Sequence, residues 1–340
     1  MKAAFINQLN KPLIIRDNIS YENLKKGQVL VKIKYAGICG SQLYEIYGGR
    51  DNKKYIPHLL GHEATGIVID YHPSVKKIKK NDRVILTWIK SDGIQAENPN
   101  YYYGNVKLNS GSITTFSSES IVSENRLIEL PKDISYRKGV ILGCAFPTGA
   151  GMILNQIKKT KGKKIAFIGL GGVGVSALLT ALNFNFKEIY AFDLDLKKIQ
   201  KLKNEIGQKK INFNSFSNED KIKFKDYFDY AIETSGSIQG IEAGLSIINN
   251  SGKLVFASHP EKGKKISIDP FELIKGKKIY GSWGGEVDYL KQKKTLFKIF
   301  KGIKNVEKIF MDNIYSFNNI NRAISDLKSN KVLRPIIKMT

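Results

Sequence analysis

The chain has 340 residues, of which 42% are hydrophobic, 10% aromatic and 25% charged. One compact core rarely holds so many residues, so we expect two domains, and the composition excludes a disordered or collagen-like chain. The 55 basic and 31 acidic residues give a net charge of +24, which favours anionic partners. Only seven of the basic residues are Arg, the residue that reads guanine edges and phosphates bidentately. A general preference for Lys therefore explains the charge better than a nucleic-acid partner does.

Cysteine content and apolar runs favour a soluble, cytoplasmic protein. Cys39 and Cys144 are too few and too far apart for a disulfide framework, and the first residues lack the apolar core of a secretion signal. The longest uncharged run, Ile165 to Phe186, is long enough for a membrane helix, but four glycines in its first half would break that helix. A strand, a tight turn and a helix explain this run better.

Residues 1–145 contain short stretches rich in Val, Ile, Thr and Tyr, separated by turn residues. This spacing predicts a β-barrel-like or sandwich domain. Residues 98–109 (NPNYYYGNVKLN) are expected to form an irregular surface lobe. The expected strands are Lys2–Ile6, Gln28–Gly37, Gly66–Tyr71, Asp82–Thr87, Ser112–Ser123 and Leu127–Leu130.

From about Phe146 the pattern changes to alternating apolar strands and helices, which predicts an α/β domain with a doubly wound parallel sheet over residues 146–285. Residues 286–340 return to helix and strand and end in Leu333–Met339. The expected strands are Lys164–Ile168, Glu188–Phe192, Phe228–Glu233, Gly252–Ala257 and Lys278–Gly281, and the expected helices are Val173–Leu182, Leu196–Ile206 and Ile238–Leu245.

A glycine-rich turn lies between the first of these strands and its helix. It fits the dinucleotide-binding pattern G-x-G-x-x-G, in which the first glycine makes the tight turn, the second lets the backbone approach a pyrophosphate, and the third lets helix and strand pack closely. Asp193 ends the next strand, where its carboxylate can accept both ribose hydroxyls of an adenosine, so NAD is the expected cofactor. The alternatives are a turn without a ligand and Asp193 as a surface residue. The residues of the turn are Gly169, Leu170, Gly171, Gly172, Val173 and Gly174.

Cys39, His62 and Cys144 are three donors of the kind that bind a catalytic zinc ion with a fourth position left open. From spacing alone, two buried thiols and a core histidine are the commoner interpretation. The local motifs favour the metal: GICGS at 37–41, GHE at 61–63 and GCAFPTG at 143–149.

With the GLGGVG turn and the tail KVLR at 331–334, these motifs closely resemble the zinc-dependent alcohol dehydrogenases of the medium-chain dehydrogenase/reductase family, in its polyol and sugar dehydrogenase branch. The resemblance implies a GroES-like catalytic domain over residues 1–145, an NAD-binding Rossmann domain over 146–285, and a return of 286–340 to the catalytic domain. It also implies that relatives assemble as homodimers or homotetramers through the edge of the Rossmann sheet, for which residues 277–281 are the candidate strand.

The resemblance assigns roles by position. Cys39, His62 and Cys144 become the ligands of one zinc ion, Glu63 an alternative ligand, and Ser41 the hydroxyl that takes the substrate proton. Trp88 falls on a position that lines the substrate pocket, although a core aromatic residue is an equal alternative. The implied cofactor residues, besides the glycine turn and Asp193, are Thr148 against the nicotinamide, the backbone of Ser282 and Trp283 at its amide, Lys198 at the adenosine ribose, and Arg334 at the pyrophosphate, with a surface Arg as the alternative for Arg334.

Three positions depart from the family pattern. Tyr44 replaces the histidine that ends the proton relay, so the proton leaves through Tyr44, water or bulk solvent. Gln42 replaces an Asp that supports the zinc-bound His, and a neutral amide is a weaker acceptor. The stretch at residues 89–110, which holds a second, structural zinc in relatives, contains no cysteine, so we expect no such metal here.

The expected reaction is the NAD-dependent interconversion of an alcohol and its carbonyl compound. The GICGS motif and the polar residues Gln42, Glu45 and Tyr47 favour a polyol or sugar-like secondary alcohol, with a primary or aromatic alcohol as the alternative. Two less favoured hypotheses are a non-catalytic relative that binds a polyanion and a zinc-free reductase.

Overall fold

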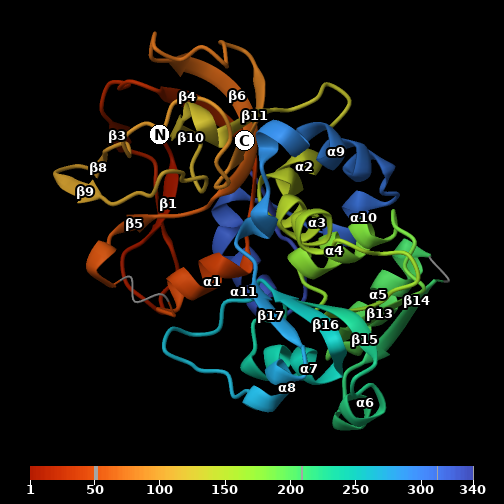
Figure 1. The fold of residues 1–340 in the computed structure, drawn as a ribbon. Helices are drawn as coiled ribbons and strands as arrows, with labels where there is room; N and C mark the ends of the chain where they lie inside the picture. Colours follow the sequence, from red (N-terminus) through yellow and green to blue (C-terminus); the bar gives the residue numbers. More distant parts are fainter. Residues whose placement is uncertain (50–52, 208–209, 312, 340) are drawn as a thin grey trace. The chain divides into compact units, whose positions relative to one another are not determined.

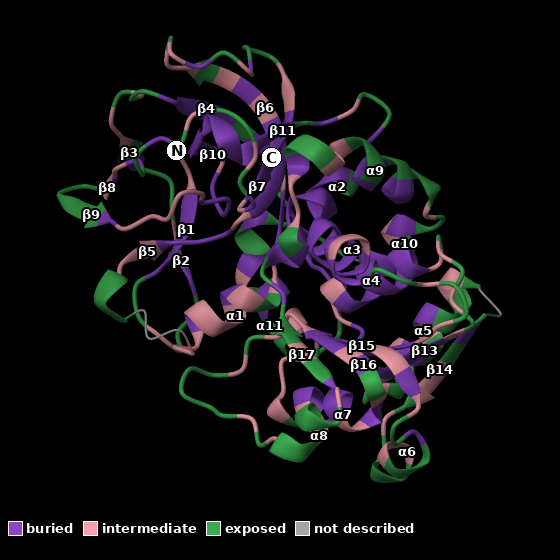
Figure 2. Ribbon diagram, in the orientation of Figure 1, coloured by how far each residue is buried: buried purple, intermediate pink, exposed green. Residues whose placement is uncertain are grey.

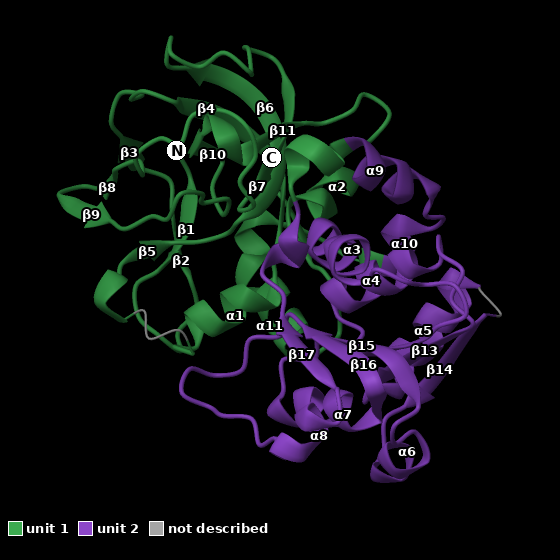
Figure 3. Ribbon diagram, in the orientation of Figure 1, with its two compact units in different colours: residues 1–144, 288–293, 310–340 green, residues 145–287, 294–309 purple. Residues whose placement is uncertain are grey.

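The computed structural model describes residues 1–49, 53–207, 210–311 and 313–339. The chain divides into two compact units, which Figure 1 traces along the sequence and Figure 3 separates by colour. Unit 1 comprises Met1–Cys144, Asp288–Lys293 and Phe310–Thr340, and unit 2 comprises Ala145–Val287 and Lys294–Ile309. In the C-terminal segment, residues 288–293 and 310–340 belong to unit 1 and residues 294–309 to unit 2. The domain boundaries expected from the sequence stay a prediction.

The main sheet of unit 1 has seven strands, in the order β11-β7-β6-β4-β19-β18, with β10 also paired to β4. Its centre is the long strand β4, which is buried over most of its length because Val, Leu and Ile residues fill it. The last strand of the chain, β19, is antiparallel to β4, with Ile336 opposite Gly37. The strands are β4 (Gln28–Gly37), β6 (Glu63–Tyr71), β7 (Arg83–Thr87), β10 (Glu119–Ser123), β11 (Leu127–Glu129), β18 (Ile314–Ser316) and β19 (Ile336–Lys338).

Two three-stranded sheets complete the strands of unit 1, in the orders β2-β1-β5 and β3-β8-β9. Short helices connect the strands. The strands are β1 (Ala3–Ile6), β2 (Ile14–Arg16), β3 (Ile19–Tyr21), β5 (His58–Leu59), β8 (Tyr101–Tyr103) and β9 (Val106–Leu108). The helices are α1 (Gly40–Ile46), α2 (Tyr136–Gly139) and α11 (Ile320–Lys328), with 3₁₀ helices η1 (Lys53–Tyr55), η2 (Glu124–Arg126), η3 (Val140–Gly143) and η5 (Phe317–Asn319).

The expectation of an irregular lobe over residues 98–109 is wrong. Tyr103 pairs with Val106 across a two-residue Gly-Asn turn, so β8 and β9 form a hairpin, and β8 adds to β3. Gly104 adopts a positive φ of 57°, which a hairpin turn of this kind requires. Tyr101 is fully buried, and its hydroxyl accepts a hydrogen bond from the backbone N–H of Ile121 at 2.9 Å. The tyrosine run is thus a strand that packs into the unit.

Unit 2 contains a parallel six-stranded sheet in the order β14-β13-β12-β15-β16-β17, as the alternating pattern predicted. The strand order reverses at β12, since β13 and β14 lie on one side of it and β15 to β17 on the other. Strand β14 was not predicted, because its sequence INFNS has only two apolar residues. The strands are β12 (Lys164–Ile168), β13 (Glu188–Asp193), β14 (Ile211–Ser215), β15 (Phe228–Glu233), β16 (Ile248–Phe256) and β17 (Lys278–Gly281).

Helices of unit 2 differ in burial, as Figure 2 shows for the buried α4 and the exposed α8. α4 is apolar on nearly all sides, and α3 packs so closely on it that a Cβ on Gly149 would overlap the carbonyl oxygen of Val173. The helices are α3 (Ala145–Gln156), α4 (Gly172–Ala181), α5 (Leu196–Ile206), α6 (Asn218–Lys223), α7 (Ile238–Ile247), α8 (Pro270–Ile274) and η4 (Gly284–Glu286). Helices α9 (Tyr289–Gly302) and α10 (Val306–Phe310) belong to the C-terminal segment that the two units share.

Among the described residues, no helix combines the length and the apolar character that crossing a bilayer requires.

Candidate active site

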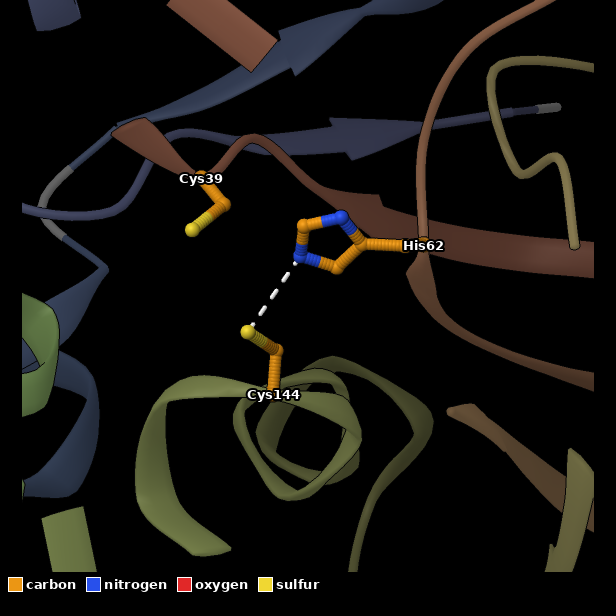
Figure 4. Close-up of side chains that lie close together, drawn as sticks. All are labelled: Cys39, His62 and Cys144. Carbon is orange, nitrogen blue, oxygen red and sulfur yellow. Dashed lines mark hydrogen bonds between the residues drawn. The ribbon is translucent and has the colours of Figure 1, made fainter. Parts of the chain in front are cut away.

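Three segments of unit 1 bring Cys39, His62 and Cys144 together. Strands β4 and β6 are antiparallel neighbours, with Ala36 opposite Ala64, so the residue after β4 and the residue before β6 lie at the same end of the sheet. Cys39 precedes α1 there, His62 directly precedes β6, and Cys144 follows η3, which packs against β6 and β7. Figure 4 shows the three side chains pointing toward one another. The convergence that the motifs implied is therefore present.

The geometry of the three donors suits a zinc ion. The two Sγ atoms and the histidine ring nitrogen all lie within 4.8 Å of one another, and His62 Nε2 is 3.2 Å from Cys144 Sγ. Bonds of about 2.3 Å to sulfur and about 2.0 Å to nitrogen place tetrahedral ligand atoms roughly 3.5 Å apart, so closing around the ion requires shifts of about 1 Å. Two soft sulfur donors and one imidazole match the ligand preference of zinc.

The electrostatics of the three side chains prepare them for a cation. A hydrogen bond from Cys144 and the nearby Arg334 guanidinium hold the pKa of the Cys39 thiol well below its usual range. The same hydrogen bond, together with burial, raises the pKa of Cys144 well above its usual range, since a second negative charge beside Cys39 is unfavourable. Burial lowers the pKa of His62, but contact with Cys39 outweighs burial and leaves it raised. A bound cation would release the protons that this group retains.

Gln42 orients both Cys39 and His62. It lies in the first turn of α1, is 1% exposed, and its Oε1 accepts the backbone N–H of Cys39 at 2.8 Å. Its Nε2 donates to His62 Nδ1 at 2.7 Å, which leaves the imidazole hydrogen on Nε2, facing Cys144. A metal bound at His62 Nε2 needs a lone pair there, so the hydrogen must move to Nδ1 and find an acceptor. The Gln42 amide can turn its oxygen to His62 only by giving up the bond to Cys39.

We therefore expect Gln42→Glu to bind zinc about tenfold more tightly, because a carboxylate can accept both N–H groups at once. Competition against a chelator of known affinity measures the change. Gln95→Glu is the matched control, since Gln95 is an exposed residue of the same unit that bonds to Ala96 and Ser123. Zinc binding by Gln42→Glu that is equal to or weaker than that of the wild type would contradict this account.

Glu63 and Arg334 form a buried ion pair beside the three donors. Glu63 is 0% and Arg334 3% exposed, and Arg334 Nη1 lies 2.9 Å from Glu63 Oε1. Gly37 leaves room for this carboxylate, since a Cβ there would lie 2.7 Å from Glu63 Oε1. Arg334 lies two residues before β19, which pairs with β4, and Ile38 N–H donates to the carbonyl of Pro335 at 3.1 Å. The sequence did not predict this pair. Roles of Glu63 as an alternative zinc ligand and of Arg334 at a pyrophosphate stay predictions.

Three further residues of unit 1 were predicted to belong to the site: Ser41, Trp88 and Tyr44. Ser41 lies in the first turn of α1, and Gln42 Nε2 donates to its hydroxyl at 3.4 Å. Trp88 is half-buried and directly follows Thr87, which pairs with Glu63 at the end of the β6–β7 ladder. Tyr44 is half-buried on α1, and a Cβ on Gly49 would lie 2.5 Å from its ring. The role of Tyr44 in the proton path stays a prediction.

Three side chains that the sequence suggested as hydroxyl-binding groups already have partners. Gln42 bonds to Cys39 and His62 as described, Glu45 lies 3.8 Å from His58 Nε2, and the Tyr47 ring is 3.7 Å from Lys328 Nζ. Partners of this kind depend on long-range contacts, so the residue types alone could not indicate them. The polyol substrate that these three residues suggested therefore stays a prediction.

The glycine turn of unit 2 has the geometry of a dinucleotide site. Gly169 adopts a φ of +83°, as its place in the tight turn requires. A Cβ on Gly174 would overlap the carbonyl oxygen of Gly169 and lie 2.5 Å from Thr234 Oγ1, so only glycine fits between strand and helix. A Cβ on Gly171, by contrast, would meet no atom within 4 Å. The open face at Gly171 and the N-terminus of α4, which includes Gly172 and Val173, suit a pyrophosphate.

The remaining cofactor residues of unit 2 have polar atoms suited to NAD. Asp193 accepts the N–H of Leu170 at 2.7 Å and lies 3.0 Å from Lys198 Nζ, so carboxylate, lysine and turn form one group. Thr148 is 7% and Ser282 8% exposed, and neither hydroxyl has a hydrogen-bond partner among the described residues. A Cβ on Gly285 would overlap the carbonyl oxygen of Thr148, which places the segment after Ser282 against Thr148. Trp283 is 70% exposed.

Comparison with protein families identifies both parts of the chain. Residues 25–132 match the alcohol dehydrogenase GroES-like domain, and residues 172–300 match the zinc-binding dehydrogenase family. The chain belongs to the zinc-dependent alcohol dehydrogenases of the medium-chain dehydrogenase/reductase family. It is thus an oxidoreductase acting on CH–OH groups, with zinc and NAD as the cofactors typical of its family.

Individual relatives match the zinc-dependent dehydrogenase over its whole length. The chain is 25% identical over 368 residues to an S-(hydroxymethyl)glutathione dehydrogenase of Escherichia coli O1:K1, covering 99% of each chain. Among solved structures, benzyl alcohol dehydrogenase of Acinetobacter calcoaceticus matches with a TM-score of 0.86 at 23% identity, covering 100% of this chain and 99% of that one. The 2R,3R-butanediol dehydrogenase of Bacillus subtilis has a TM-score of 0.77 at 21% identity, with the same coverage. At these identities the solved structures establish the fold.

Proposed function

We propose that this dehydrogenase interconverts a secondary, polyhydroxylated alcohol and its carbonyl compound, with Cys39, His62 and Cys144 as the ligands of one zinc ion. The observation that carries the proposal is the convergence of two thiols and an imidazole within 4.8 Å. When bound, zinc supplies a Lewis acid that lowers the pKa of an alcohol hydroxyl, and NAD supplies the acceptor for its hydride.

The chain's own residues handle the proton and hold the cofactors. Ser41 Oγ accepts the hydroxyl proton of the substrate and passes its own hydrogen onward, while Gln42 fixes the backbone of Cys39 and the ring of His62. Asp193 and Lys198 bind the adenosine ribose, and Gly171 and α4 bind the pyrophosphate. Thr148, Ser282 and Trp283 hold the nicotinamide, with the two hydroxyls that lack partners among the described residues as its polar contacts.

A substrate with substituents on both sides of the carbinol carbon fits the surroundings of Cys39. The next residue is the exposed Gly40, where a Cβ would meet no atom within 4 Å, so no side chain of the described residues crowds this position. An aromatic alcohol is the second candidate, since the half-buried Trp88 follows the residue opposite Glu63 and offers an apolar face to a ring.

A substrate screen on metal-analysed enzyme tests the proposal. We expect one zinc per chain and NAD reduction that is faster with glucitol or 2,3-butanediol than with ethanol or benzyl alcohol, with NAD preferred over NADP because of Asp193. Preference for benzyl alcohol would select the aromatic alternative. Full turnover in zinc-free protein, or no turnover with any alcohol, would refute the proposal.

The proposed assembly is a homodimer or homotetramer joined along β17. This strand lies at the end of the six-stranded sheet, and Tyr280 on it is 45% exposed. A second copy that adds its own β17 would satisfy the open edge of the sheet. The proposed location is the cytoplasm, which the free thiols of Cys39 and Cys144 suit, since cytoplasmic thiols stay reduced.

A further inference from the structure

Glu233, the last residue of β15, is a buried carboxyl group in unit 2 to which the motifs assigned no role. It is 0% exposed. Its Oε1 accepts the backbone N–H of Ser235 at 2.7 Å and the hydroxyl of Ser235 at 2.5 Å, and its Oε2 accepts the hydroxyl of Ser258. Burial raises the pKa of Glu233 although these bonds oppose it. These three hydrogen bonds offset the cost of burying the carboxyl and fix the two serine side chains relative to it.

Two glycines leave room for Glu233 and Ser235, because a side chain at either glycine would collide with them. A Cβ on Gly240, in the first turn of α7, would overlap Ser235 Oγ and lie 2.8 Å from Glu233 Oε1. A Cβ on Gly169, in the dinucleotide turn, would lie 2.6 Å from the Cα of Ser235. The carboxyl and its serines therefore fill the space between the glycine turn and α7.

The position in the sheet indicates which part of a dinucleotide lies nearby. Ligands of such sheets bind outside the carboxyl ends of the strands, at the point where the strand order reverses, which here lies between β12 and β15. Asp193, proposed for the adenosine ribose, ends β13 on one side of β12. Ser258 follows β16 on the other side, and Ala257 N–H donates to the carbonyl of Glu233 at 3.0 Å. A dinucleotide that crosses β12 from Asp193 places its nicotinamide half on the side of Ser258.

The hydroxyl of Ser258 has a defined direction. Its hydrogen is donated to Glu233, so only oxygen lone pairs remain for another partner, and the residue is half-buried rather than enclosed. Ser235 differs, since its oxygen already accepts the N–H of Ser237 at 3.2 Å. Ser258 Oγ can therefore accept a hydrogen bond from a ligand that carries a hydroxyl or amide donor.

We propose that Glu233 is a positioning residue for the cofactor: it fixes the hydrogen of Ser258, so that Ser258 Oγ accepts a hydrogen bond from the nicotinamide half of NAD. The ribose hydroxyls and the carboxamide N–H₂ of that half are donors of the required kind. The inference rests on the proposed NAD-binding role of unit 2, and it adds a contact that the family motifs do not contain.

Equilibrium binding of NADH and of AMP, without alcohol, tests the inference. Ser258→Ala and Glu233→Gln are each expected to weaken NADH binding about tenfold, the double variant no more than either single one, and AMP binding is expected to stay unchanged. Glu242→Gln is the matched control, because Glu242 makes the same type of bond, to Ser267 N–H at 2.8 Å, on the exposed side of the unit. NADH fluorescence and calorimetry with AMP provide the two affinities.

Three results would overturn the inference. If Ser258→Ala binds NADH within twofold of the wild-type affinity, Ser258 makes no contact with NAD. This result overturns the inference even if Glu233→Gln does not fold. Losses that multiply in the double variant show that Glu233 does not act through Ser258. Equal weakening of NADH and AMP shows a general structural role. Wild-type protein that binds neither ligand would instead refute the proposed function itself.

Discussion

The His62→Ala and Cys39→Ala variants are expected to lose their zinc and at least about a hundredfold of their rate of alcohol oxidation. Removing one of three protein ligands leaves two, too few for a catalytic site, and this must cost more than the 10- to 100-fold that loss of an outer-shell partner costs. The fold should survive, because the sheet of unit 1 is held by β4, β6 and β19 independently of the metal. Emission spectroscopy measures the zinc content of each variant, and kcat/KM for alcohol oxidation measures its activity.

His72→Ala is the matched control for this experiment. His72 lies in the same unit, and its Nδ1 bonds to Ser74 at 2.9 Å, so its loss should leave zinc content and kcat/KM unchanged. A His62→Ala protein that keeps one zinc per chain and wild-type kcat/KM would show that the ion is bound elsewhere, and the proposed reaction would then lose its basis.

Alanine substitutions at two glycines of the dinucleotide turn should affect different properties: protein stability at Gly174 and NADH affinity at Gly171. Gly174→Ala is expected to cost about 2–3 kcal/mol of unfolding free energy, because its Cβ would overlap the carbonyl oxygen of Gly169 and press on Thr234. Gly171→Ala should leave stability unchanged within about 0.5 kcal/mol, since a Cβ there meets no atom within 4 Å and φ is −77°. Its methyl group occupies the face where a pyrophosphate must approach, so NADH affinity should fall at least about tenfold.

Thermal unfolding and NADH titration of both variants separate the two effects. The two alanines serve as controls for each other, because the chemical change is the same and the positions are three residues apart. Wild-type NADH affinity in Gly171→Ala would contradict the assignment of the pyrophosphate to this turn. Wild-type stability in Gly174→Ala would contradict the described contact between strand and helix.

Features set by short stretches of sequence could be predicted. The parallel strands of unit 2 are apolar runs, and the turn at Gly169 carries its glycines at fixed spacing, so local pattern was sufficient. Where local pattern was weak, prediction failed. Strand β14 has few apolar residues and pairs with β13 through its backbone. The tyrosines of β8 form a strand because they pair with β3 and because the turn at Gly104 leads into β9.

The candidate site shows the same division. Cys39, His62 and Cys144 stood out by residue type and motif, and their convergence follows from the pairing of β4 with β6. The bond between Glu63 and Arg334 joins residues 271 positions apart, and no residue pattern indicates which acid a buried arginine will meet. The sequence did not indicate the group of Glu233 and its serines for a related reason, because burial of this carboxyl depends on the packing of α7 against it.

The pairing of β19 with β4 has a consequence for how the enzyme is made. During synthesis, the ribosome releases Cys39 and His62 early, but the strand that completes their sheet and the arginine beside Glu63 emerge among the last residues. Unit 2 lies between them and can fold while translation continues. The three candidate ligands are therefore synthesised long before the strand and the arginine that complete their surroundings, and a premature stop that removes only the final dozen residues would delete β19 and Arg334 while leaving Cys39, His62 and Cys144 in the chain.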